Sequence, residues 1–227
     1  GKGLTEWKTG KVTSMRAMFN NAQKFAGTLE YHLLEWDTSQ VTDMAYMFYN
    51  ASIFDGLLSL WQTGNVTTMK AMFKNATLFN KYIGCSPTFA DRSGGLVWDT
   101  SKVIDMSEMF YGATTFNQAI GRTGSFYGTW DTSNVTDMSD MFRDASSFNK
   151  PIAIWNVSKL KYMDRMFVNA TAFKQNLTSW VEELPDVDGE DKTRYTYEEL
   201  MKTLYWGVPE DRRVPYPRPP PKPVPPE

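Results

Sequence analysis

One 19-residue pattern recurs six times along the chain and limits what it can fold into. Residues 130–148, WDTSNVTDMSDMFRDASSF, show it best: apolar residues follow Trp130 at offsets of five, eight, eleven, twelve, fifteen and eighteen. The same register starts at Trp7, Trp36, Trp61, Trp98, Trp130 and Trp155, with a partial copy at Trp180. A fixed self-similar spacing indicates an internal repeat, so we predict one array of stacked units rather than separate globules.

The distance between successive Trp residues shows where the repeat tolerates extra chain. It is 25 residues in three of the six intervals and reaches 37 in the longest. All the additional length falls between the last Phe of one copy and the next Trp, in residues 26–35, 80–97 and 117–129. Insertions at one register emerge on one side of a stack, so we expect three loops on a common side.

The expected fold class is an α/β repeat solenoid. Trp, Thr and Val at the start of each copy favour a short extended segment ending in a turn. The later apolar offsets of three and four residues are typical of a helix. We expect that helix to end after about two turns, at a column of Asn, Asp or Gly that tolerates the left-handed conformation. This column comprises Asn21, Asn50, Asn75, Gly112, Asp144 and Asn169. The five tryptophans predicted to lie in the core are Trp36, Trp61, Trp98, Trp130 and Trp155.

The repeat register is lost after Trp180, which divides the chain into three parts. Residues 1–181 form the predicted solenoid, and residues 182–208 an acidic linker with a capping helix over 196–206. Residues 209–227 form a proline-rich tail with the extended character of polyproline II.

Composition and charge exclude several classes of partner. The net charge is −2 and no basic stripe follows the repeats, which argues against nucleic acid. No run of 18 apolar residues is present, so we expect no membrane span. The N-terminus lacks the apolar core of a signal peptide, and we expect the chain to be a mature or trimmed form.

Catalytic and metal-binding patterns are weak, so we predict a protein that is not an enzyme and uses no cofactor. His32 and Cys85 are the only residues of their kinds, and neither lies in a nucleophile motif. The acidic cluster at residues 186–191 lacks the Gly and Glu spacing of a calcium loop, and we interpret it as a solvated linker.

Candidate modification and interaction sites lie in turns, insertions and the tail. Of seven N-x-S/T sequons, those at Asn65, Asn134, Asn156 and Asn176 are the glycosylation candidates. At Asn50, Asn75 and Asn169 the left-handed column explains the sequon without a glycan. The interaction candidates are aromatic, basic or proline residues: Phe89, Arg92, Phe126, Tyr127, Pro215, Tyr216, Pro219, Pro220 and Pro221.

The run from Trp130 to Asn149, W-D-T-S-N-V-T-D-M-S-D-M-F-x-x-A-x-x-F-N, resembles the bacterial surface protein repeat. That family includes BspA-like proteins, mycoplasma-type and listerial surface lipoproteins, and many algal and protist proteins. The resemblance covers Trp7 to Trp180 and implies a leucine-rich-repeat-like solenoid outside the cell, with attachment or interaction roles. The insertions and the proline tail depart from the plain repeat, and they favour a eukaryotic microbe as the source.

Two functions are compatible with these features. The first is a non-enzymatic extracellular structural or adhesive protein, for example a subunit of a surface filament, with contacts through the insertions and the tail. Its partners would be proteins or further copies of itself. The second is a glycan-binding module that uses the aromatic residues of the insertions. Removing the tail distinguishes them, because only the first function needs it.

Overall fold

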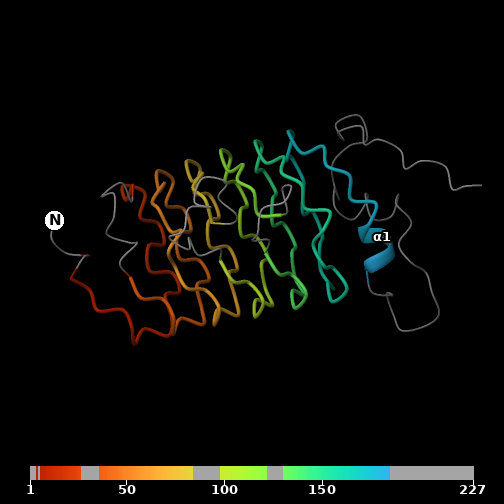
Figure 1. The fold of residues 1–227 in the computed structure, drawn as a ribbon. Helices are drawn as coiled ribbons and strands as arrows, with labels where there is room; N and C mark the ends of the chain where they lie inside the picture. Colours follow the sequence, from red (N-terminus) through yellow and green to blue (C-terminus); the bar gives the residue numbers. More distant parts are fainter. Residues whose placement is uncertain (1–3, 5, 27–35, 84–97, 122–129, 185–227) are drawn as a thin grey trace, which may run out of the picture.

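The chain winds into an elongated stack of coils, one coil for each repeat, in sequence order from end to end (Figure 1). The computed structural model describes residues 4, 6–26, 36–83, 98–121 and 130–184. The only helix in these residues is α1, Trp180–Glu183, at the C-terminal end of the stack. Extended structure over the same residues is limited to isolated parallel bridges at one position per coil: Ser14–Asp43, Asp43–Thr68, Thr68–Asp105, Asp105–Asp137 and Asp137–Tyr162.

Backbone hydrogen bonds between neighbouring coils hold the stack together. In the second coil the N–H groups of Met44, Tyr46, Phe48 and Asn50 donate to the carbonyls of Thr68, Lys70, Met72 and Lys74 in the third. The same four bonds recur at every interface between the six coils, together with at least one bond in the opposite direction. Every second residue therefore donates its backbone N–H to the next coil, which satisfies these groups without a continuous sheet.

The predicted α/β class is wrong, because the helix expected in each coil does not form. The residue ten positions after each Trp has a positive φ, between 51° and 60°, whereas a right-handed helix needs a negative φ. These residues are Ala17, Tyr46, Ala71, Glu108, Asp140 and Arg165. Between the residues that donate to the next coil, other N–H groups close tight turns within the coil, as the N–H of Met47 does by donating to the carbonyl of Met44. Such turns space apolar residues by three, so they imitate the periodicity of a helix.

The left-handed column predicted from its Asn, Asp and Gly residues is confirmed. All six members, from Asn21 to Asn169, have φ between 56° and 66°. No helix ends there, however. The left-handed residue turns the coil, and in the first five coils its N–H group continues the row of bonds to the next coil.

The core consists of three aromatic ladders that run the length of the stack. Trp rings from successive coils stack with centroids 5.7–6.5 Å apart, from Trp7 to Trp180. Two Phe ladders run beside them with spacings of 5.4–6.0 Å, and within a coil the two Phe rings lie about 4 Å apart. Trp36, Trp61, Trp98, Trp130 and Trp155 are at most 3% exposed.

A further buried column, four residues after the last Phe of a copy, was missed by the sequence analysis. Its members are Leu58, Ile83, Ile120, Ile152 and Leu177, all at most 1% exposed. Carbonyls of this column accept the indole N–H of Trp98, Trp130 and Trp155 at 3.0–3.3 Å. Residues 80–83 and 117–120 thus belong to the coils, and the predicted insertions begin later than their Phe boundary suggested. The expected capping helix and the proline tail lie outside the described residues.

A candidate interaction surface along the coils

Most polar columns of the repeat hold neighbouring coils together. A buried threonine lies two residues after Trp in the first five coils, and in the second to fifth its hydroxyl donates to the backbone of the next coil. The bonds run from Thr38 to Gln62, Thr63 to Asp99, Thr100 to Asp131 and Thr132 to Asn156, at 2.9–3.0 Å. A second ladder joins side-chain amides: Asn75 donates to Asn50, and Asn50 to Asn21, both at 2.8 Å. The repeated residue type at such positions is explained by stacking alone.

Two columns, ten and thirteen residues after each Trp, differ in chemistry from coil to coil. They read Ala17, Tyr46, Ala71, Glu108, Asp140, Arg165 and Asn20, Tyr49, Lys74, Tyr111, Arg143, Val168. Since the fold does not fix their residue type, these positions are free to serve another purpose. We use the name charged strip for the charged and tyrosine side chains of these columns, together with the charged side chains linked to them: Arg16, Asp43, Tyr46, Tyr49, Lys74, Glu108, Tyr111, Asp140, Arg143, Asp144 and Arg165.

The first half of the charged strip is built from cations packed on tyrosine rings. The guanidinium carbon of Arg16 lies 4.9 Å from the centroid of the Tyr46 ring, and Tyr46 meets Tyr49 edge-on at 6.0 Å. The ammonium of Lys74 lies between two rings, 5.9 Å from that of Tyr49 and 4.4 Å from that of Tyr111. Such contacts fix a long cationic side chain at a partly exposed site.

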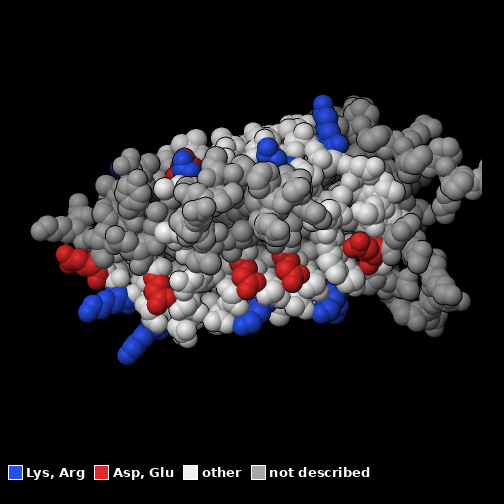
Figure 2. All heavy atoms as spheres, viewed as in Figure 1, with Lys and Arg blue, Asp and Glu red and all other residues white. Residues whose placement is uncertain are grey.

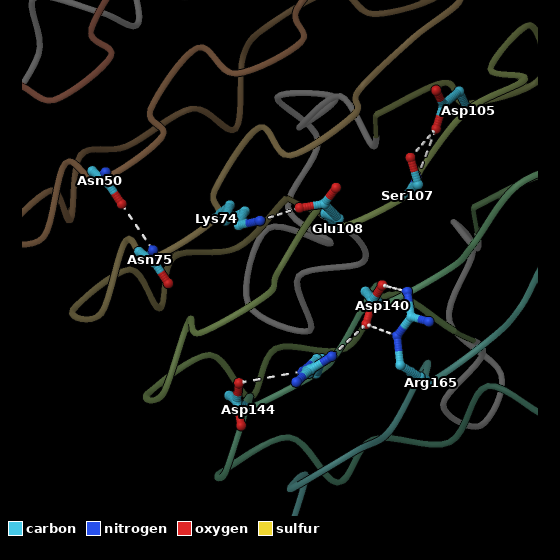
Figure 3. Close-up of polar contacts among 10 residues, drawn as sticks. Asn50, Lys74, Asn75, Asp105, Ser107, Glu108, Asp140, Asp144 and Arg165 are labelled. Carbon is cyan, nitrogen blue, oxygen red and sulfur yellow. Dashed lines mark hydrogen bonds and ion pairs between the residues drawn. The ribbon is translucent and has the colours of Figure 1, made fainter. Parts of the chain in front are cut away.

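Lys74 also forms an ion pair with Glu108 in the next coil (Figure 3). Burial alone would lower the pKa of Lys74. The hydrogen bond and the charge of Glu108, with smaller contributions from Tyr49 and Tyr111, outweigh burial and raise this pKa. Lys74 is therefore held in its charged form.

The second half of the charged strip is centred on Asp140, which is only 8% exposed. Arg165 binds it through two parallel hydrogen bonds, from Nε at 3.0 Å and from an NH2 nitrogen at 2.6 Å. Arg143 contacts Asp140 at 3.3 Å and Asp144 at 3.7 Å, and packs 5.4 Å from the ring of Tyr111. The hydrogen bond to Asp140 raises the pKa of the Arg165 guanidinium.

Together these contacts form an unbroken chain of side chains across all six coils. It includes four cations, Arg16, Lys74, Arg143 and Arg165, which pair with four carboxylates, Asp43, Glu108, Asp140 and Asp144. On the face drawn in Figure 2, acidic and basic side chains of the described residues lie at separate points, with no large area of one sign. A surface of this kind offers both signs of charge and aromatic rings, which suits a polar macromolecule in extended contact.

The structure separates the four candidate glycosylation sites into two pairs. The side-chain nitrogens of Asn65 and Asn134 donate to the carbonyls of Ser39 and Ser101, both at 2.7 Å. Their oxygens accept from Lys102 and Lys159, so both amides are engaged in stacking.

Asn156 and Asn176 form the other pair, and both are exposed. Their side-chain oxygens accept hydrogen bonds from Ser158 and Thr178 of their own turns, while no bond within the described residues uses their nitrogens. The third group of sequons, at Asn50, Asn75 and Asn169, donates along the amide ladder.

The remaining predicted site residues lie outside the described part of the chain. They are Phe89, Arg92, Phe126, Tyr127, Pro215, Tyr216, Pro219, Pro220 and Pro221, together with His32, Cys85 and the acidic cluster at 186–191. The charged strip was not predicted from the sequence, because its two columns do not repeat a residue type. The available signal was the opposite one, namely two columns that vary inside an otherwise uniform repeat.

Among the described residues no group of three or more His, Cys, Asp or Glu side chains is placed to hold a metal ion. No helix there is long and apolar enough to span a bilayer.

Comparison with known proteins gives one match. Residues 1–94 and 88–192 match the family described as "Mycoplasma protein of unknown function, DUF285". Neither the curated proteins nor the solved structures gave a match. Because the two matched segments run consecutively over most of the chain, this repeat protein belongs to the DUF285 family.

Proposed function

We propose that the chain is a non-enzymatic extracellular repeat protein with a structural or adhesive role, acting as a subunit of a surface filament or appendage. The observation that carries this proposal is the charged strip. It runs through six coils while the other polar columns are engaged in stacking. A line of tyrosine and arginine side chains on a stiff support is suited to binding a macromolecule, since these residues are enriched where interfaces gain most energy.

The extracellular location rests on likeness to surface-protein repeats. The W-D-T-S-N-V-T-D-M motif is similar to repeats of BspA-like and listerial surface proteins, and the family's description refers to mycoplasma proteins. A leucine-rich-repeat-like solenoid is the architecture that this likeness favours. The stacked coils are compatible with it, although their backbone is turned rather than helical.

Contacts with partners are assigned to three regions. The charged strip supplies one, and the aromatic residues of the two later insertions and the proline-rich tail supply the others. A polyproline segment is pre-organised for binding because little chain entropy remains to be lost.

Sedimentation velocity and electron microscopy of the purified full chain test the proposal. We expect concentration-dependent assembly that is lost when residues 209–227 are removed. We also expect the pair Lys74→Ala and Arg143→Ala, within the charged strip, to weaken assembly.

The matched control is the pair Lys102→Ala and Lys159→Ala, which removes the same charge from exposed positions outside the strip. This pair should assemble normally. A full chain that stays monomeric, and does not promote adhesion when coated on beads, contradicts the proposal. Binding to an array of immobilised glycans that survives tail removal would instead favour the glycan-binding function.

A further inference from the structure

The N-terminal end of the stack is an open surface. Trp7 is 50% exposed, and Val12, Met18, Phe19 and Phe25 of the first coil are only partly buried. In the second to sixth coils the members of the same five columns are at most 3% exposed. The aromatic ladders therefore end in rings that have a neighbour on one side and solvent on the other.

The two ends of the stack differ. In the sixth coil Met166, Phe167 and Phe173 are 0% exposed, so the apolar columns of the last coil are covered. An exposed apolar end of a repeat array is costly, because core side chains are left in water. Of the two ends, only the N-terminal end leaves side chains of the core columns exposed to solvent.

The direction of the backbone hydrogen bonds defines what this end can bind. At each interface the earlier coil donates four N–H groups and the later coil supplies the carbonyls. In the first coil the corresponding carbonyls belong to Ser14, Arg16, Met18 and Asn20. No hydrogen bond from the residues that the structure describes reaches any of these four. Like the edge of a sheet, the row is a template for further pairing.

We propose that the N-terminal end is a docking surface for one more coil of this same repeat, joined to the chain ahead of Trp7. Such a coil offers four N–H donors at the required spacing. It also presents Trp and Phe rings that continue the three ladders. It would accept one bond in return, from the N–H of Thr13, as each coil does from the next.

A second copy of this chain does not fit the surface. Its own N-terminal end would oppose carbonyls to carbonyls, which leaves both rows unpaired. Its last coil is covered, as its buried Phe167 and Phe173 show. The docked segment is therefore a coil in continuity with the stack.

The test inserts a copy of residues 130–154 between Glu6 and Trp7 of the full chain. The register is preserved, because Leu4 precedes Trp7 by three residues as Ile152 precedes Trp155. We expect the midpoint of thermal unfolding to rise. We expect the exposed fraction of Trp7 to fall from 50% toward the values of at most 3% found for Trp36 to Trp180, with less quenching of Trp fluorescence by acrylamide.

Two controls make the result decisive. A copy in which Trp130, Met138, Met141, Phe142 and Phe148 are replaced by Ser should give no rise and no protection of Trp7. The intact copy placed between Ile154 and Trp155 shows whether an added coil folds at an internal position. If the internal copy is tolerated while the N-terminal copy changes neither the midpoint nor the quenching of Trp7, the proposal is wrong.

Discussion

At the residue scale, a single buried hydroxyl performs two tasks in the stack. Thr38 is 0% exposed, and its Oγ1 donates to the carbonyl of Gln62 at 3.0 Å while accepting from the N–H of the same residue at 2.8 Å. The Thr38 hydroxyl thus pairs with the N–H and carbonyl of Gln62. The row of backbone bonds to the third coil begins only at Met44 and does not include these groups. The column accepts a valine at Val157, so its shape does not require a hydroxyl.

Replacing Thr38 by Val is therefore predicted to destabilise the fold through lost hydrogen bonds and not through a clash. The N–H and carbonyl of Gln62 would lose their partner at this part-buried contact, which costs about 1 kcal/mol. Urea denaturation should show a lower midpoint with an unchanged slope. Thr42→Val is the control, since Thr42 is exposed and its single bond to Thr13 can be replaced by water. Equal losses in the two variants would contradict this explanation.

The aspartates that follow Trp36 and Trp98 are predicted to make stability depend on acid. Hydrogen bonds from Ser39 and Ser101 lower the pKa of Asp37 and Asp99 below the ordinary value of 3.8. A carboxyl with a lower pKa in the folded chain stabilises it above pH 3.8, and this contribution is lost as the pH falls through the folded pKa.

The double variant Asp37→Asn, Asp99→Asn should therefore lose less stability than the parent between about pH 5 and pH 2. Asparagine keeps the turn, because Asn156 accepts the same bond from Ser158 in the sixth coil. Thermal unfolding across this pH range measures the difference. Parallel curves for parent and variant would show that these turns do not contribute to the acid sensitivity.

At the element scale, the sequence predicted the repeat, its core columns and one left-handed position, but not the path of the coil. The missed feature is the positive φ ten residues after each Trp. Residues as different as Tyr46, Glu108 and Arg165 occupy this position, so the residue type does not predict the positive φ. In the first five coils it is imposed by the next coil, whose carbonyls accept the N–H of this residue and the N–H groups two positions before and after it. Local propensity favoured a helix, and pairing between coils overrode it.

Gly112 interrupts the amide ladder and allows a test of this element. It occupies the left-handed column with φ of 66°, and a Cβ placed there would lie 2.3 Å from Oδ1 of Asn75. In the third coil Asn75 fills the position and donates to Asn50, and in the fifth coil Asp144 accepts a bond from Asn169. Gly112→Asn should therefore extend the ladder once Asn75 rotates, and raise stability by about 0.5–1.5 kcal/mol.

Gly112→Ala is the matched variant, because it adds the Cβ without a polar group. It should lower stability, since alanine at positive φ is strained and cannot bond to Asn75. The two unfolding midpoints should thus move in opposite directions. A decrease for both would mean that the space beside Asn75 cannot adapt.

At the scale of the whole molecule, stacking creates a surface that no short stretch of sequence contains. Lys74 meets Glu108, and Asp140 meets Arg165, only because residues 25 or more positions apart become neighbours. The register that brings them together could be read from the Trp spacing. The contacts themselves could not, because they depend on which way each turned coil directs its side chains.

The stack is predicted to tolerate loss of one complete coil. Deleting residues 130–154 joins residue 129 to Trp155, so every column and every coil-to-coil bond has its counterpart in the new neighbour. Stability in a repeat array is close to a sum over coils and interfaces, so the shortened chain should fold with a lower unfolding midpoint. The same deletion removes Asp140 and Arg143, and we expect it to weaken the assembly that depends on the charged strip.

Deleting residues 138–158 is the control, because it removes 21 residues from within the repeat and shifts the register. Met163 would then follow Trp130 by 12 residues instead of 8, so its core columns would not align with those of the fourth coil. Size-exclusion chromatography and acrylamide quenching of tryptophan should show a compact, protected chain for the 25-residue deletion and a more open one for the shorter deletion. If both deletions fold equally well, the junction is flexible enough to absorb a register error. If neither folds, the fifth coil contributes contacts that the sixth cannot replace, and the coils are not interchangeable units.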